Sequence, residues 1–586
     1  MKTIRLNREW SSEEKAVSLP FDVLSATRRN YTAAYGGLNS YYDAASVRIE
    51  RDMPIRSYHK AFLETSGVGD KANIYGDGKY LGTVAYPGRS LFPLASGISK
   101  IAYDIAAVNS GRYTGCGISD GVTLYYASSP IYIDPYGVTV YATPALKAEL
   151  VVEVALTNET GARRKATLTV EVFNRRGRRL TKKNKTVQVP AGHKDCYVKA
   201  AFSRYAFWPG SDSVYTLRVS LQSEEMSDEA ETVFGIQHED GLPEMQRLAA
   251  DNGILGAASF LTAERRKLSI LKRDGYTAAV TGLPSEALLQ AADETGIRLI
   301  IQPLAFLHKP PTPFTPPVTD EDVERLLDNI RAVRNHPCIV AYAMPDDEPD
   351  KAFGQKIATY GHKPVVRLNG DAYYFDFLGE QADKRRYNSL GRYDVLGIEK
   401  PGASVRADAP RIVVTPPGQA PLSSWDLPDC VGQEVTVEVH TAGEVVSLLL
   451  DGKQIGRKLA GSVNGYKATF KVEYRPGVLE AVCFHRGFEQ ARARLGETSV
   501  PKRLRVTPQT KCADVNGDGL AYFLIEATDA YGNAVTQCDC DVTVQVTGGE
   551  LFAFDNGDPY SEKETENTVK LYGGKAIAVT RATEPG

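Results

Sequence analysis

The chain has 586 residues, too many for one hydrophobic core, and this length predicts roughly three to five domains. Hydrophobic residues make up 42% and charged residues 24%, as in ordinary globular proteins, and the formal net charge of −3 argues against nucleic acid or an anionic membrane as partner. No stretch reaches the roughly 20 apolar residues of a membrane helix, and residues 1–8 lack the apolar core of a signal peptide, so we expect a cytoplasmic protein.

Residues 1–240 show the pattern of short strands separated by turns. Many of the turns contain Gly, Pro, Asn or Asp, which is typical of β-sandwiches. The clearest predicted strands are Val138–Tyr141, Leu150–Val154, Ala166–Val170 and Tyr215–Val219.

From about residue 240 the pattern changes to alternating helices and strands, which predicts βα units and a parallel sheet. We expect helices at Ala263–Leu271, with Thr262 as N-cap, at Glu286–Glu294 and at Asp320–Val333. The expected strands are Tyr276–Val280, Arg298–Gln302 and Cys338–Ala343. A Pro-rich linker follows at 415–421, and strand patterns return at 433–495 and from 503 to the end.

The eight cysteines are sparse for this length and include no CxxC pair, so a zinc ribbon is not expected. Cys538 and Cys540 are two residues apart and would lie on one face of a strand. We expect free thiols at all eight positions.

Several short motifs, in this order along the chain, resemble those of glycoside hydrolase family 2, the family of many β-galactosidases. Each match is short, but their shared order extends over most of the chain. The motifs are Ser18–Asp22 (similar to LPHD), Ile74–Gly82 (VxxNGxxxG), Gly111–Ile118 (RWYxGxGIYR), Phe234–Ile236 (FGxR), Leu450–Gly456, Tyr474–Leu479 and Asp555–Pro559.

The resemblance implies a multidomain fold in which β-sandwiches flank a TIM-type (β/α) barrel. It implies a sugar-binding-like jelly roll at 1–130, an immunoglobulin-like sandwich at 131–238, a reduced barrel at 239–410, an accessory sandwich at 411–497 and a C-terminal immunoglobulin-like sandwich at 498–586. The region 239–410 is shorter than the roughly 250 residues of a typical barrel. We therefore expect an open barrel edge, which another subunit of a homo- or hetero-oligomer would cover.

The family's acid/base motif, RNHPSIxxWxxGNE, is similar to the segment from Arg334 to Glu348. The match is specific through Ile339, but the ending is altered. An ungapped alignment puts Asp347 at the acid/base position, and one inserted residue puts Glu348 there. Asn335 and Asp346, which belong to the same motif, are expected to contact the sugar. A solvated acidic loop after a core strand is the alternative.

The family's nucleophile motif in one subgroup, LGSExxSxxxxRG, is similar to the segment around Glu399. Glu399 follows an apolar run, as an acid at the end of a barrel strand should. The resemblance implies a retaining exo-β-glycosidase that acts on a terminal β-glycoside, with β-galactoside as the default, and needs no cofactor. A solvated surface Glu is the alternative.

Several family residues are replaced in this chain. Val280 stands where the family has an Arg, Gln302 where it has an acid, and the Trp-rich final strand has no equivalent. An Arg beside a carboxylate keeps it ionised, and Val cannot do so. The active site is therefore predicted to be degenerate, and a catalytically inactive carbohydrate-binding or partner subunit is the alternative function.

Three smaller features complete the predictions. Trp425 is expected either to stack on sugar or to pack between domains. The segment from Asp514 to Gly519, including Asp518, matches the first half of a calcium loop, but its twelfth position is Ile525 instead of Glu, so a turn between strands is the alternative. The three clustered acids Asp346, Asp347 and Glu348 could also form a rebuilt site that holds a divalent metal, with a solvated acidic cluster as the alternative; no other metal site is predicted.

Overall fold

The computed structural model shows a mostly β chain with one α/β region. Contacts divide it into two compact units: 1–27, 42–251 and 256–375 form the first, and 28–41, 252–255 and 376–586 the second. The described residues are 1–22, 46–237, 248–250, 260–303, 319–367, 396–398 and 410–583, without positions 14, 69–70, 85–87, 107, 110–113, 211, 274–275, 283, 345–350, 420, 497–499, 514–517, 531, 533 and 559–566.

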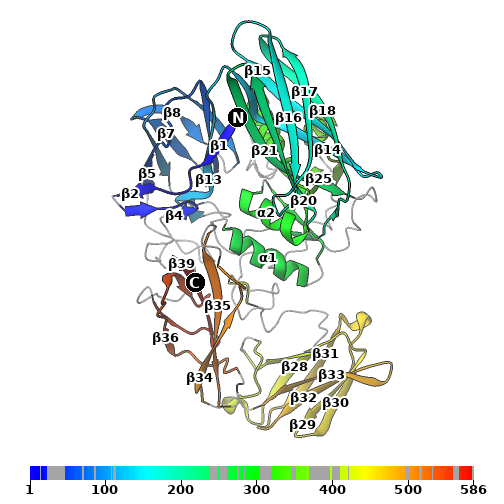
Figure 1. The fold of residues 1–586 in the computed structure, drawn as a ribbon. Helices are drawn as coiled ribbons and strands as arrows, with labels where there is room; N and C mark the ends of the chain where they lie inside the picture. The colour runs from blue at the N-terminus through cyan, green and yellow to red at the C-terminus, as the bar shows by residue number, and fades with distance from the viewer. Residues whose placement is uncertain are drawn as a thin grey trace. The chain divides into compact units, whose positions relative to one another are not determined.

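The first unit begins with a sandwich of two antiparallel sheets (Figure 1). Alternating apolar residues of both sheets form its core, which includes Trp10, Ile49, Leu63 and Leu124. One sheet contains β1 (Lys2–Arg5), β13 (Gly117–Ala127), β6 (Lys60–Val68) and β9 (Ser90–Leu94), with β4 (Phe21–Asp22) paired to β13. The other contains β3 (Lys15–Val17), β2 (Trp10–Ser12), β5 (Ser46–Asp52), β10 (Lys100–Ala106), β7 (Ala72–Gly76) and β8 (Lys79–Val84), and β11 (Val108–Asn109) pairs with β12 (Thr114–Gly115).

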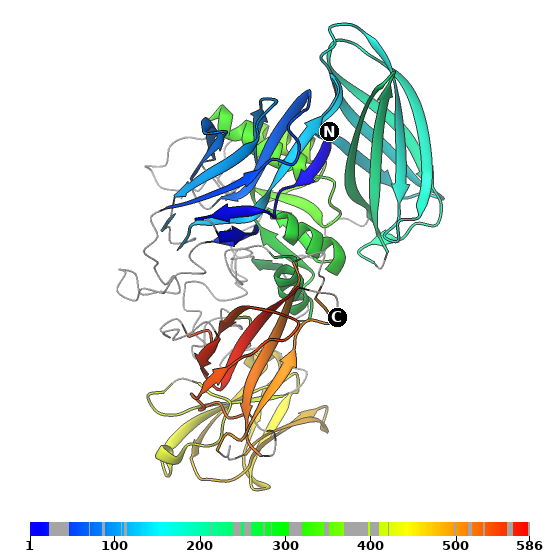
Figure 2. The same cartoon turned by 60° about the vertical axis from the view of Figure 1, so that its left-hand side comes forward.

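A second sandwich follows, with long strands that are clear in Figure 2. Its strands alternate buried apolar and exposed polar residues, as each strand of a two-layer sandwich should. The four strands predicted here are confirmed as parts of β14, β15, β16 and β20. The sheets contain β14 (Ile131–Thr143), β15 (Ala148–Asn158) and β18 (Gly192–Phe202), and β17 (Arg179–Val189), β16 (Arg164–Phe173), β20 (Val214–Ser223), β21 (Met226–Gln237) and β19 (Phe207–Trp208).

The α/β region contains a parallel sheet whose strands follow chain order, as in consecutive βα units. The strands are β22 (Leu248–Ala250), β23 (Ala278–Thr281), β24 (Arg298–Ile301), β25 (Ile339–Met344) and β26 (Val365–Arg367). The helices are α1 (Leu261–Arg273), α2 (Glu286–Thr295), α3 (Asp320–Val333) and α4 (Lys351–Gly361).

Capping residues define the ends of α2 and α3. Helix α3 has the predicted bounds and begins with a capping box between Thr319 and Asp322. Helix α2 begins after the N-cap Ser285 and ends at Gly296, which has a positive φ of 78°. The predicted cap of α1 is wrong, because the helix begins at Leu261 and Thr262 is buried inside it.

The second unit contains two more sandwiches. The first has a core around Val437, Leu448 and Phe470. Its sheets contain β27 (Arg411–Thr415), β28 (Glu434–His440) and β31 (Lys467–Glu473), and β30 (Lys453–Leu459), β29 (Val445–Leu450), β32 (Leu479–His485) and β33 (Phe488–Leu495).

The last sandwich contains β34 (Arg503–Pro508), β35 (Leu520–Thr528), β39 (Lys575–Ala582) and β37 (Gly549–Asp555), with β36 (Asp541–Thr543) paired to β38 (Thr568–Lys570). Ile525 lies inside β35 with only 4% of its surface exposed. The twelfth position of the supposed calcium loop is therefore a core residue, which favours the turn over the loop; positions 514–517 lie outside the described residues.

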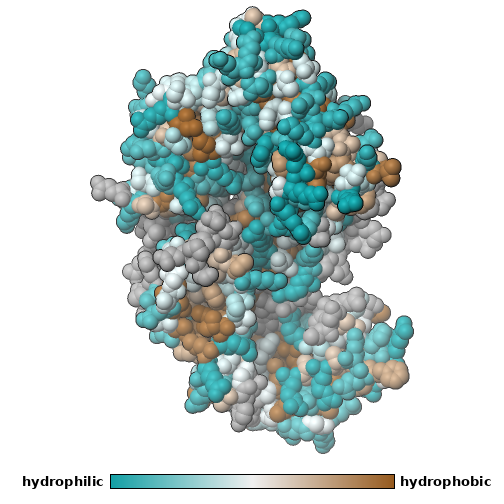
Figure 3. All heavy atoms as spheres, viewed as in Figure 1, coloured by the Kyte–Doolittle hydropathy of each residue, from teal (hydrophilic) through white to brown (hydrophobic). Residues whose placement is uncertain are grey.

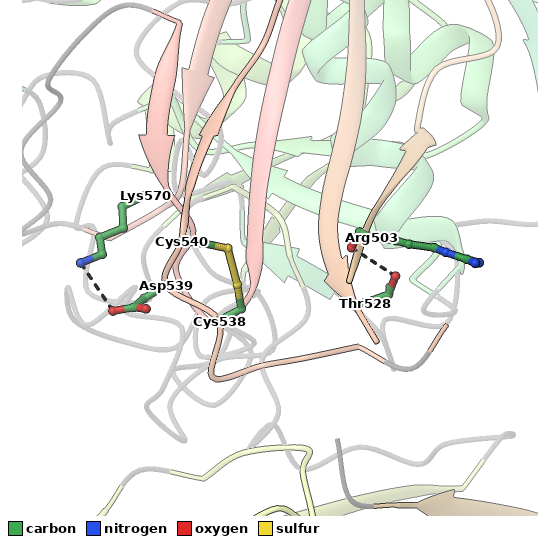
Figure 4. The surroundings of a disulfide bond; sticks show 6 residues. All are labelled: Arg503, Thr528, Cys538, Asp539, Cys540 and Lys570. Atoms are coloured by element: carbon green, nitrogen blue, oxygen red, sulfur yellow. Dashed lines mark hydrogen bonds and ion pairs between the residues drawn. A yellow bond between two sulfur atoms is a disulfide. The ribbon is translucent and has the colours of Figure 1, made fainter. Parts of the chain in front are cut away.

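Two of the eight cysteines are paired. Cys538 and Cys540 form a disulfide (Figure 4), so the prediction of free thiols is wrong for this pair. Spacing alone could not decide it, because two cysteines two residues apart can form a disulfide where the backbone bends between them.

The face in Figure 3 is mainly hydrophilic, with hydrophobic residues in separate patches. Among the described helices, none has both the length and the apolar character needed to cross a membrane.

Candidate active site

The parallel sheet brings the carboxyl ends of its strands to one edge. In barrels and open α/β sheets this is the edge where catalytic groups gather. Thr281 ends β23, and its carbonyl accepts a hydrogen bond of 2.7 Å from the backbone N–H of Gln302, which follows β24. The ends of these neighbouring strands therefore lie side by side.

One face of this sheet is small and apolar. Ala278, Val280, Ile300, Ala341 and Ala343 form its core cluster, with Val340 and Val366 packed against it. Val280, at the position of the family's Arg, is 9% exposed in this cluster. Among the described residues of this cluster, no side chain can pair with a neighbouring carboxylate.

The predicted catalytic acids follow the described strand ends along the chain. Strand β25 ends at Met344, two residues before Asp346. Asp346, Asp347 and Glu348 lie outside the described residues, and so does Glu399, which follows the described turn at 396–398. Their catalytic and substrate-binding roles remain predictions.

Asn335 lies at the other end of β25, before the strand begins. Its side-chain amide donates to the carbonyl of Val138 (2.8 Å) and to Oγ1 of Thr232 (3.1 Å), and its oxygen accepts from the N–H of Val140 (3.0 Å). Neighbouring Arg334 donates to the carbonyl of Tyr136 (3.1 Å). These three hydrogen bonds join the α/β region to the second sandwich, and the contact of Asn335 with a sugar stays a prediction.

The same motif places His336 beside Asp293, near the end of α2. Nδ1 of His336 lies 2.7 Å from Oδ2 of Asp293, and the N–H of Cys338 donates to Oδ1 (2.9 Å). Burial alone would lower the pKa of His336, but the Asp293 carboxylate and its hydrogen bond outweigh burial and raise that pKa.

Asp293, His336 and Cys338 are also the one group of potential metal ligands within the described part of the chain, with ligand atoms less than 4.8 Å apart. Burial raises the pKa of the Cys338 thiol well above its usual value, and both oxygens of Asp293 accept hydrogen bonds. Both Asp293 oxygens are thus already engaged by hydrogen bonds from within the group, to the ring of His336 and the N–H of Cys338. The group is a hydrogen-bonded structural cluster.

Trp425 does not stack on sugar or pack between domains. It is 0% exposed in the core of the first sandwich of the second unit, where it contacts Tyr474 edge-on with ring centroids 4.9 Å apart. Its indole N–H donates to the carbonyl of Arg475 (3.0 Å). Both predicted alternatives for Trp425 are therefore wrong.

A buried charged group that the sequence analysis missed holds the loop between β23 and α2. Arg89, from the first sandwich, donates to the carbonyl of Pro284 (3.3 Å) and to Glu286 (3.3 Å), and its Nε lies 4.0 Å from Glu64. Glu64 also accepts hydrogen bonds from the hydroxyls of Tyr125 (3.4 Å) and Tyr136. This group fixes the start of α2 next to the carboxyl edge of the sheet.

The pKa values of the two carboxyls in this group move apart. Burial raises the pKa of Glu64, against the effect of Arg89. Burial also opposes ionisation of Glu286, but His336 and Arg89 outweigh it and lower that pKa. Positions 64, 89 and 286 are far apart in the sequence, and no local motif marks them, so only the packing of the two regions reveals the group.

The sequence matches known families in three regions. Residues 131–237 match the family described as glycosyl hydrolases family 2, residues 504–586 match glycoside hydrolase family 2 C-terminal domain 5, and residues 432–491 match a domain of unknown function. The chain belongs to glycoside hydrolase family 2. The resemblance expected from the motifs is thereby confirmed at the level of the family.

Individual relatives agree with this assignment. The β-galactosidase BoGH2A of Bacteroides ovatus is 27% identical over 151 residues, which cover 25% of this chain but only 18% of that enzyme. The fold is similar to a solved family 2 member from Bacteroides cellulosilyticus (TM-score 0.82, 18% identity, 100% of this chain and 97% of that one). It is also similar to a β-glycosidase from Bacteroides vulgatus (TM-score 0.76, 15% identity, 100% and 97%).

Proposed function

We propose that this family 2 protein is a retaining exo-β-glycosidase, with its active site at the carboxyl edge of the parallel sheet. The observation that supports this most is the position of β25, which ends at Met344 on that edge, two residues before the acidic run 346–348. The apolar surroundings of this edge favour tight electrostatic interactions between a substrate and any carboxylate nearby. A reduced (β/α) barrel is the architecture we propose around it.

Glu399 is proposed as the nucleophile and Glu348, or Asp347, as the acid/base. The nucleophile attacks the anomeric carbon while the acid protonates the departing glycosidic oxygen, so that the bond to the aglycone breaks as the bond to the enzyme forms. The same residue then takes a proton from water, which attacks the anomeric carbon and releases Glu399. The two carboxyl groups must lie about 5–5.5 Å apart for this mechanism.

The substrate is a terminal β-glycoside, and β-galactoside is the first choice because the curated relative is a β-galactosidase. The test is hydrolysis of aryl β-galactoside, β-glucoside, β-glucuronide and β-mannoside by the protein and by Glu399→Gln. Glu434→Gln is the matched control, because Glu434 is an exposed acid on β28, far along the chain from the site.

We expect one sugar to be hydrolysed with retention, with loss of activity in Glu399→Gln and normal rates in Glu434→Gln. Glu348→Gln and Asp347→Asn distinguish the two acid/base candidates. In the variant that lacks the acid/base residue, the hydrolysis rate should depend strongly on the acidity of the leaving group, and in the other variant it should not. No hydrolysis of any substrate by folded protein would overturn the proposal in favour of an inactive subunit. Coverage of the open barrel edge by another subunit stays a separate prediction.

A further inference from the structure

A large cleft lies in the first unit, where its two sandwiches meet helix α2. Its volume is about 980 Å³, at the upper end of the roughly 300–1,000 Å³ of small-molecule sites. The surface between β1 and β21 in Figure 3 is hydrophilic, in keeping with the residues of the cleft. The predicted catalytic residues Asp347, Glu348 and Glu399 lie outside the described residues, and Asn335, which was predicted to contact the sugar, is among the residues that line the cleft.

One face of α2 forms a wall of the cleft. Glu286, Gln290, Asp293 and Glu294 line it, at spacings of three and four residues that place them on one side of a helix. A helix of this length extends about 15 Å, so the cleft runs from the carboxyl edge of the sheet toward its amino edge. The polar face of α2 is therefore turned toward the two sandwiches, which form the other walls.

The lining has polar and apolar surface in about equal parts, and its charges are nearly balanced. It contains seven carboxyl side chains and five guanidinium groups, and several of these already pair with each other or with neighbours, as Arg218 does with Glu231 (3.0 Å). A polyanion or a polycation would find no surplus of opposite charge here. An uncharged ligand with many hydroxyl groups would find donors and acceptors on every wall.

The Nε2 atom of His336 is a polar group that a ligand in the cleft could contact. It is 9% exposed, and its Nδ1 is held by Asp293. Within the described residues, no hydrogen bond satisfies its other ring nitrogen, Nε2. The side chain of His336 is 11% exposed and lines the cleft, so this nitrogen can form a hydrogen bond with a ligand hydroxyl there.

Two tyrosines add the second element of carbohydrate recognition. Tyr125 and Tyr136 line the cleft edge-on to each other, with ring centroids 5.7 Å apart, and both hydroxyls are held by Glu64. Rings fixed in this way present apolar surface beside polar groups, which suits a ligand with both C–H faces and hydroxyls.

We propose that this cleft is a second saccharide-binding site, separate from the candidate active site, for an uncharged oligosaccharide. Binding at this cleft does not require catalysis, so it can be measured in a protein that does not turn over substrate. Gln290 is exposed on α2, so Gln290→Arg should fold while its longer side chain fills the cleft and pairs with Glu286 and Glu294. Gln355→Arg is the matched control, an exposed Gln on α4 outside the cleft.

The experiment is calorimetric titration of the Glu399→Gln protein, which prevents turnover, with neutral oligosaccharides of several linkages and with an oligogalacturonate as the anionic probe. We expect a neutral oligosaccharide to bind with a component that Gln290→Arg weakens at least tenfold and Gln355→Arg leaves unchanged. Should Gln290→Arg not fold, Thr123→Leu on β13 takes its place in the same comparison.

Three results would overturn the proposal. The first is that no neutral oligosaccharide binds. The second is that Gln290→Arg and Thr123→Leu bind the neutral oligosaccharide as strongly as the protein without these substitutions. The third is that these substitutions change the binding of the anionic probe only. Loss of aryl glycoside hydrolysis has no bearing on this outcome, so failure of the proposed catalytic function and failure of the second site are distinguishable.

Discussion

Removal of the Arg89 guanidinium should destabilise the contact between the first sandwich and α2. Arg89 lies 4.0 Å from the buried carboxyl of Glu64 and 3.3 Å from that of Glu286, whose side chain is 36% exposed. Taking away one partner of a buried ion pair costs about 3–5 kcal/mol, because the remaining charge stays buried without compensation. We therefore expect Arg89→Met to lower the local stability around α2 by this amount at pH 8.

The cost should depend on pH in a defined direction. Burial holds the pKa of Glu64 above its usual 4.5, so the folded state binds this proton more tightly than the unfolded state. As pH rises from the pKa of Glu64 in the unfolded state to its raised pKa in the folded state, such a group lowers the free energy of unfolding. The loss is up to about 1.4 kcal/mol for each unit by which the two pKa values differ. Without Arg89 the pKa of Glu64 rises further, so Arg89→Met should be milder at pH 5 than at pH 8.

Hydrogen exchange of the α2 amides is the appropriate assay, because a chain of several domains does not unfold in one step. Arg48→Met is the control: Arg48 pairs with Asp104 (2.6 Å) on the same sandwich but is half exposed, so its loss should cost less than about 1 kcal/mol. Arg89→Met/Glu64→Gln should recover about 1–3 kcal/mol. Unchanged exchange in α2, or an equal loss at both pH values, would refute the reasoning.

Three further predictions concern Trp425, Asn335 and the disulfide between Cys538 and Cys540. Trp425→Ala should destabilise its sandwich by about 3–5 kcal/mol, measured by hydrogen exchange of β28 and β31, without altering saccharide binding in a titration; weaker binding in the folded variant would contradict the core role. Asn335→Ala should speed hydrogen exchange in β14, because three hydrogen bonds are lost, each worth about 1 kcal/mol; unchanged exchange would mean that the bonds contribute nothing. Cys538→Ser should lower the stability of the last sandwich by about 1.5 kcal/mol, the estimate for a very short closed loop, and added reductant should then have no further effect on its thermal unfolding.

The sequence predicted those parts of the fold that local patterns determine. The bounds of α3 follow from its acidic first turn and from Thr319, and the alternation of helix and strand predicted β23, β24 and β25 within a few residues. The motif at 334–337 was located correctly before β25, but the hydrogen bonds of Asn335 to the second sandwich could not be predicted, because a short motif does not show what its residues contact in distant segments.

The remaining errors have a common physical cause. The environment of Trp425 and the meeting of Arg89 with Glu286 depend on how distant segments pack, and this leaves no periodic signal in the sequence. The cleft along α2 could not be predicted for the same reason, since its walls come from three regions of the chain.

Covalent trapping tests the central claim most directly. A 2-deoxy-2-fluoro β-glycoside with a good leaving group, of the sugar preferred in the aryl glycoside assay, should leave its glycosyl group on the nucleophile of a retaining enzyme. If Glu399 is the nucleophile, intact mass should show one added fluorosugar, located on Glu399 by peptide mapping and absent in Glu399→Gln. Folded protein that is never labelled by any of the four sugars, or a label on a different residue, would contradict the claim.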